Sequence, residues 1–74
     1  MGKTVGTRNR LDRYKHIELH FDPVTKQYIV MPHRYSIDRW EYYDEDEKEE
    51  AYDRFNELEN EEREKERQIS KTVY

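Results

Sequence analysis

Apolar and polar side chains alternate strictly over a short segment that begins after the first fifteen residues. Ile17, Leu19 and Phe21 fall on one side of this pattern, and the residues between them are polar. A two-residue period of this kind is typical of a β-strand with one buried face. A second segment, residues 27–31, is rich in β-branched and aromatic side chains and ends before Pro32, which cannot donate to a central ladder. Two strands are therefore predicted.

The five residues between these strands have the composition of a tight turn. Their sequence is Asp22-Pro23-Val24-Thr25-Lys26, with Asp and Pro at the favoured first and second positions of a type I turn. Two strands joined in this way form a β-hairpin. Lys26 stands where glycine is common, which predicts slight strain in the turn.

The segment 37–43 fits two descriptions. As a third strand it would place Trp40 and Tyr42 on one face and Tyr43 on the other. A short helical turn that starts at Ser36 fits nearly as well, so both interpretations stay open.

A long helix is predicted in the C-terminal part of the chain. Asp44 is a favourable N-cap, and Glu47 three residues later completes the spacing of a capping box. Ala51, Phe55 and Leu58 then recur at helical spacing and form one narrow apolar stripe. The stripe stops after Leu58, so the last turns are predicted to project from the body or to fray.

These elements define an α+β fold class, in which an antiparallel β-hairpin, with a third strand as an alternative, packs against one long C-terminal acidic α-helix. Residues 1–13 lack periodicity and contain both glycines, so they are interpreted as a flexible basic arm. Residues 14–69 are expected to form a single small domain, and residues 70–74 a flexible tail. Open strand edges make a homodimer a further expectation. The predicted core contains Ile17, Leu19, Phe21, Tyr28, Val30, Trp40, Ala51, Phe55 and Leu58.

Composition narrows the class of protein. A length of 74 residues allows one domain, and 43% of the residues are charged. Ten aromatic residues nevertheless favour a folded core over a disordered chain. The sequence has no cysteine, no apolar signal region after Met1 and no run of the roughly 20 apolar residues that span a membrane. We therefore expect a cytoplasmic protein.

Charge is divided unevenly along the chain. Residues 1–40 carry eight Lys or Arg against four Asp or Glu, whereas residues 41–74 carry six against fourteen. The formal net charge of −4 hides this division. An asymmetry of this size indicates that partners are chosen by electrostatics.

Six carboxylates are expected to form a charge row on the outer face of the helix. At about 100° per residue, they lie opposite Phe55 or on the flank of that sector, three or four residues apart. No Lys or Arg falls in this sector along the row. A solvated surface helix carries such charges too, but a spaced line of negative charge is also what a nucleic-acid backbone presents to its binding proteins. The row consists of Asp46, Glu50, Asp53, Glu57, Glu61 and Glu64.

Aromatic residues beside the charge row are candidate anchors for a partner. Tyrosine buries a large area at an interface at low entropic cost, and Tyr43 and Tyr52 stand next to the acidic residues. Trp40 is expected to be a core residue instead.

The basic N-terminal segment supports an alternative. Lys3, Arg8, Arg10 and Arg13 could contact phosphates directly and make the chain a minor nucleic-acid binder. The same segment could equally pack against the acidic helix of its own or a neighbouring subunit.

Catalytic and metal sites are not predicted. His16 and His20 would lie about 13 Å apart along a strand, too far to share a metal. Gly2-Lys3-Thr4 lacks the upstream glycine and strand of a phosphate-binding loop. There is no cysteine nucleophile. We expect a protein that is not an enzyme and that uses no cofactor, metal or small-molecule substrate.

Four features of general character occur together: the size, the lack of cysteine, the Asp22-Pro23-Val24-Thr25 turn and the run Glu41-Tyr42-Tyr43-Asp44-Glu45-Asp46-Glu47 before an acidic helix. In these features residues 14–66 resemble, in general character, the small early-gene products that bacteriophages make to take over their hosts, including DNA-mimic inhibitors. The resemblance implies an inhibitor that acts in the host cytoplasm. The chain departs from known mimics in its basic N-terminal half, which confines the implied mimicry to the helix.

The leading functional hypothesis is a small inhibitor or modulator that presents a DNA-mimicking acidic helix to a basic nucleic-acid-binding protein. The alternative is a general protein–protein adaptor that binds through its sheet edge or its apolar surface. The isoelectric point of the partner separates these two hypotheses.

Overall fold

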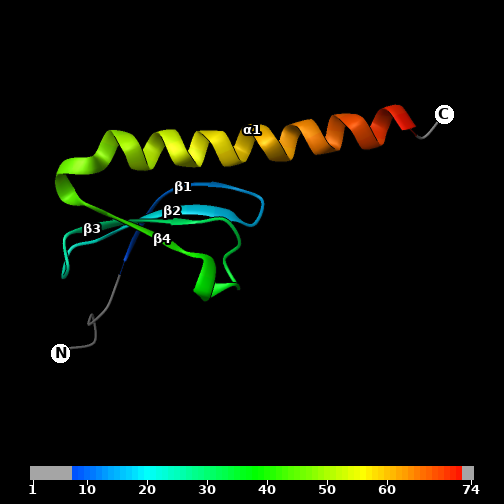
Figure 1. The fold of residues 1–74 in the computed structure, drawn as a ribbon. Helices are drawn as coiled ribbons and strands as arrows, with labels where there is room; N and C mark the ends of the chain where they lie inside the picture. The colour runs from blue at the N-terminus through cyan, green and yellow to red at the C-terminus, as the bar shows by residue number, and fades with distance from the viewer. Residues whose placement is uncertain (1–7, 73–74) are drawn as a thin grey trace.

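The structure is a computed structural model that describes the backbone of residues 8–72 and the side chains of residues 8–67. Four antiparallel strands lie side by side in chain order, and one long helix crosses one face of the sheet (Figure 1). The predicted α+β class is confirmed, with two more strands than the hairpin alone. The strands are β1 (Asn9–Tyr14), β2 (Ile17–Asp22), β3 (Gln27–Met31) and β4 (Glu41–Asp44), and the helix is α1 (Lys48–Thr72).

The predicted hairpin is formed by β2 and β3. Leu19 pairs with Val30, so both side chains face α1. In the turn, the Lys26 N–H donates to the Asp22 carbonyl at 2.7 Å, and the Asp22 carboxylate accepts from the Val24 N–H at 2.9 Å. Lys26 has a φ of 59°, the left-handed conformation that favours glycine. The strain expected at this residue is therefore confirmed.

Strand β1 corrects the prediction for the N-terminal segment. The sequence predicts a flexible arm that includes residues 9–13, but these residues pair with β2, with a bulge between Arg10 and Asp12. The strand carries a single aliphatic residue and its side chains are mostly exposed, so the sequence gives no alternating pattern to detect it. Residues 1–7 of the predicted arm, including Lys3, lie outside the described residues.

Both interpretations of residues 37–43 hold in part. A 3-10 turn, η1 (Ile37–Arg39), comes first, and β4 follows it and pairs with β3. Trp40 lies between the two elements and is half-buried. The sequence predicts it in the core, but it does not belong to the core cluster under α1. Its indole N–H donates to the His33 carbonyl at 3.2 Å, which keeps it with the connection that leads to β4.

The core lies between α1 and the sheet. Ile17, Leu19 and Val30 of the sheet pack against Ala51 and Phe55 of the helix, as predicted. Tyr28 and Leu58, also predicted, are partly buried against this cluster, whereas Phe21 is only half-buried. The partly buried tyrosines that the predicted core omitted are Tyr14, Tyr43 and Tyr52.

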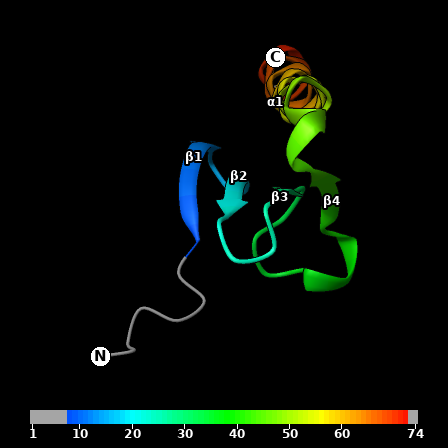
Figure 2. The same cartoon turned by 90° about the vertical axis from the view of Figure 1, so that its left-hand side faces the viewer.

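A second apolar site lies on the other face of the sheet. Ile29 and Met31 alternate with the helix-facing residues of β3, yet both are only 2% exposed. The connection between β3 and β4 lies on this side, away from α1 (Figure 2). Strand β3 is therefore buried on both faces of the sheet, whereas the sequence predicts burial only on the face that packs against the helix.

Helix α1 begins as predicted and is held along more of its length than expected. A 3-10 turn, η2 (Glu45–Glu47), precedes it, and the Asp44 N–H donates to the Glu47 carboxylate at 2.8 Å in a capping box. Past Leu58, Glu66 accepts a hydrogen bond from the Tyr14 hydroxyl at 3.1 Å and forms an ion pair with Lys15. Side-chain contacts therefore continue eight residues beyond the apolar stripe.

The predicted flexible tail also needs correction. Residues 70–72 belong to α1, and residues 73–74 lie outside the described residues. Among the residues that the structure describes, no helix combines the length and the apolarity that crossing a membrane requires.

Candidate functional site

The six residues of the charge row are exposed, which is the arrangement that their helical spacing predicts. Asp46 belongs to η2 and the others belong to α1. Phe55, the reference residue of the opposite side, is 1% exposed and lies in the core. Glu61 also lines the cavity between α1 and the sheet, so it lies at the flank of the row. The exposed set is Asp46, Glu50, Asp53, Glu57, Glu61 and Glu64.

Cations neutralise part of the charge row. Glu57 accepts a hydrogen bond from Arg54 at 2.9 Å, and Glu64 lies 3.5 Å from Arg67. Both carboxylates stay about 60% exposed, so their charge is still presented to solvent. Among residues 8–67, the other four members of the row have no ion-pair partner.

Arg54 is directed mainly toward β4. Its guanidinium donates to both carboxylate oxygens of Glu41, at 2.9 Å from Nε and at 3.2 Å from a terminal nitrogen. These hydrogen bonds, together with the bond to Glu57, raise the pKa of Arg54 above its ordinary value despite partial burial. Arg54, which lies beside the charge row, is therefore bonded mainly to Glu41 of the sheet.

The two candidate anchors lie at the seam between helix and sheet. Tyr43 and Tyr52 are half-buried and pack against the core cluster. The Tyr43 hydroxyl donates to Glu41 at 3.0 Å, and burial together with this bond raises the pKa of Tyr43. The rings therefore support α1, and the structure does not bring them onto the charge row.

A dense group of carboxylates stands where α1 begins. Ligand oxygens of Asp44, Asp46 and Glu47 lie within 4.8 Å of one another, the one such group among the described residues that could hold a metal ion. Glu47 is already engaged in the capping box, and carboxylates are stabilised at a helix N-terminus by the exposed N–H groups and the helix dipole. Capping explains this group without a metal.

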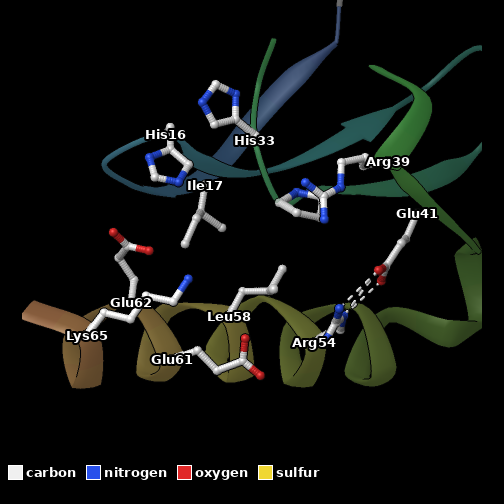
Figure 3. Close-up of a pocket in the computed structure, with 11 residues that line it drawn as sticks. His16, Ile17, His33, Arg39, Glu41, Arg54, Leu58, Glu61, Glu62 and Lys65 are labelled. Atoms are coloured by element: carbon white, nitrogen blue, oxygen red, sulfur yellow. Dashed lines mark hydrogen bonds and ion pairs between the residues drawn. The ribbon is translucent and has the colours of Figure 1, made fainter. Parts of the chain in front are cut away.

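A cavity of about 350 Å³ separates α1 from the sheet at the end where β1 turns into β2 (Figure 3). Ile17 and Leu58 form its apolar part. The His16 and His33 rings, whose centroids are 4.6 Å apart, lie at its sheet side. Arg39 also lines the cavity and, among residues 8–67, has no ion-pair partner. The His16–His33 contact was not foreseen, because residues this far apart in sequence give no joint signal.

Glu18 is buried on the sheet face away from α1 and is held by a polar network. It is 6% exposed, 2.7 Å from His20 Nε2, and it accepts a weak hydrogen bond from Arg34 at 3.5 Å. Burial opposes ionisation of this carboxyl, but His20, Arg34 and the charge of Arg10 outweigh it and lower its pKa. The sequence identified Glu18 as a polar strand position and gave no signal of its burial.

The basic residues of the alternative nucleic-acid hypothesis are partly ordered by the sheet. Arg8 lies over the Trp40 ring, with its guanidinium carbon 5.2 Å from the ring centroid. Arg10 and Arg13 are exposed on β1, opposite His20 and Glu18 on the sheet face away from α1.

Comparisons with protein-family models, with curated proteins and with solved structures found no match. The functional argument therefore rests on these surfaces.

Proposed function

We propose that the chain is a small binding protein whose acidic helix occupies the nucleic-acid-binding surface of a basic protein, and so inhibits or modulates it. The observation that carries this proposal is the exposure of the charge row on α1 and η2. The resemblance to phage inhibitors supports a bacterial nucleic-acid-binding protein as the target, reached in the cytoplasm.

The dimensions of the charge row suit this role. From Asp46 to Glu64 it extends over about 27 Å, at 1.5 Å per residue. Its carboxylates follow one another every 4.5–6 Å or so, compared with about 3.4 Å per phosphate along one DNA strand. The row is sparser than a nucleic-acid backbone but linear and of one sign, which is what a basic groove recognises.

Packing of α1 makes the charge row rigid. Phe55 and Ala51 fix the inward side of the helix, and Glu66 ties its far half to β1 and the following turn. Because the row does not have to be ordered on binding, less conformational entropy opposes the association. The partner is therefore expected to bind quickly, with an association rate that falls as salt rises.

The first test is capture of partners on the tagged protein from nuclease-treated bacterial lysate, with elution by a salt gradient and then by a short DNA duplex. The proposal expects a basic protein that the duplex displaces. A neutral or acidic partner that resists both salt and duplex would show that the helix does not imitate nucleic acid.

A matched pair of double variants then locates the binding surface. Replacing Glu50→Lys and Asp53→Lys should slow association with the captured protein by at least about tenfold. Asp12→Lys with Asp38→Lys changes the net charge equally but lies off the helix, and should have a small effect. Equal losses in the two variants would mean that net charge alone, and not the charge row, governs binding.

The adaptor hypothesis has an observation of its own. Tyr42 is 53% exposed on β4, which is an edge strand of the sheet. A partner bound there would be insensitive to the helix variants and sensitive to Tyr42→Ala. The same captured protein therefore decides between the two functions.

A further inference from the structure

The connection between β3 and β4 brings aromatic and basic side chains together, partly on the sheet face away from α1 (Figure 2) and partly at the cavity beside the helix. The chain of contacts starts at His16, whose ring lies against His33, and continues from His33 to Tyr35 with ring centroids 5.8 Å apart. We call this the connection surface, and it consists of Arg8, His16, His33, Arg34, Tyr35, Arg39 and Trp40.

Arginines are attached to this aromatic series at both ends. Arg34 lies over the Tyr35 ring at 4.9 Å, and Arg8 lies over Trp40, which is itself bonded to the His33 carbonyl. Arg39 lines the same cavity as the two stacked imidazoles (Figure 3). Three guanidinium groups thus border a row of flat rings within one short segment and its contacts.

Exposure and charge favour a ligand that is both anionic and aromatic. Tyr35 is 74% exposed, so its ring is accessible to a ligand. Asp38 is the acidic residue within the connection, whereas Glu18 beneath it is buried and paired with Arg34 and His20. The connection surface therefore has a positive balance.

The acidic helix balances part of this charge at the cavity. Glu61 of the charge row, Glu62 and Glu41 line the same cavity as Arg39. Arg8 and Arg34 lie over the Trp40 and Tyr35 rings, so these two arginines carry most of the positive charge that the connection surface offers a ligand.

We propose that the connection surface binds single-stranded nucleic acid. Bases stack on Tyr35 and His33, and backbone phosphates contact Arg8, Arg34 and Arg39. Aromatic platforms bordered by arginine bind single strands with little sequence preference, because every base offers a flat face to stack. This activity is separate from the binding of a basic protein by the helix, and the two can fail independently.

The test is fluorescence anisotropy with a labelled twelve-nucleotide oligo(dT), oligo(U) and a duplex of the same length, titrated with the full chain. We expect a Kd on the order of 10⁻⁴–10⁻⁶ M for the single strands and weaker binding of the duplex. With about three phosphate contacts, the slope of log K against log salt should be about −2.

Two variants address the surface residues without touching the core. Tyr35→Ala should weaken single-strand binding roughly tenfold through lost stacking. Arg39→Glu should weaken it and reduce the salt slope by about 0.7. Lys26→Glu makes the same charge change in the β2–β3 turn, at the other end of the sheet, and should leave binding near that of the wild type.

Circular dichroism of each variant verifies that the fold is kept, and Glu50→Lys with Asp53→Lys should leave oligonucleotide binding in place. Oligonucleotide binding that survives both Tyr35→Ala and Arg39→Glu would overturn the proposal. So would a duplex that binds as tightly as the single strands, or an absence of binding at millimolar protein.

Discussion

Glu18 is a charged residue buried on one face of the sheet, where it needs partners that replace its lost hydration. A buried carboxylate is tolerated where other groups compensate the lost hydration, and His20 with Arg34 supplies that compensation here. The alternation of β2 identifies the face on which Glu18 lies, but its burial depends on a connection sixteen residues later. Residue-level prediction therefore succeeds for the helix-facing stripe and fails for this network.

The lowered pKa of Glu18 leads to a pH-dependent contribution to stability. Because its pKa in the folded state lies below the ordinary value of 4.5, the unfolded state binds this proton more readily. The contribution is complete above pH 4.5 and is lost as the pH falls through the folded-state pKa. Thermal unfolding midpoints from about pH 6 to about pH 3 should therefore fall less steeply in Glu18→Gln than in the wild type. Parallel curves would show that the network does not favour the charged carboxyl.

Helix α1 meets the sheet by two different kinds of contact along its length. Its first half packs Ala51 and Phe55 against one face of the sheet, whereas its second half contacts β1 and the following turn through Glu66. The apolar half was predictable because the stripe has the period of the helix itself. The polar contacts of the second half were not predictable. They depend on β1, which brings Tyr14 and Lys15 to Glu66, and the sequence gives no strand pattern for β1.

Phe55 should carry a large share of the stability that the apolar half supplies. It is among the largest fully buried side chains, so Phe55→Ala leaves a cavity and should reduce the free energy of unfolding by about 3–5 kcal/mol. Phe55→Leu should cost less, about 1.5 kcal/mol or below, since most of the volume is kept. Urea unfolding followed by circular dichroism measures both, and exposed Asn56→Ala should stay within about 0.5 kcal/mol of the wild type. Equal losses in the leucine and alanine variants would argue against close packing at this position.

The whole molecule has two sheet edges, and each carries a feature that discourages pairing with a second copy. Strand β1 has a bulge beside Leu11, and bulges twist an edge away from flat pairing. If two β4 strands paired antiparallel over their full length, Glu41 would lie opposite Asp44 of the other copy, and like charges in that position are destabilising. The open edges that suggested a homodimer are therefore both protected.

We expect a monomer at micromolar concentration on this basis. Light scattering coupled to size-exclusion chromatography should give the mass of one chain, 9.3 kDa. Replacing Asp44→Lys would turn the repulsive β4 register into an attractive one and should shift part of the sample toward twice that mass. A wild-type dimer would show that another surface mediates association.

The hydrogen bond between Tyr14 and Glu66 joins residues 52 positions apart. Contacts at such a separation close a long loop and form slowly relative to the local hairpins, whose residues meet after a short search. We expect β1, β2 and β3 to pair early and the far half of α1 to dock last. The contact between β1 and the far half of α1 would then complete the fold in a late step.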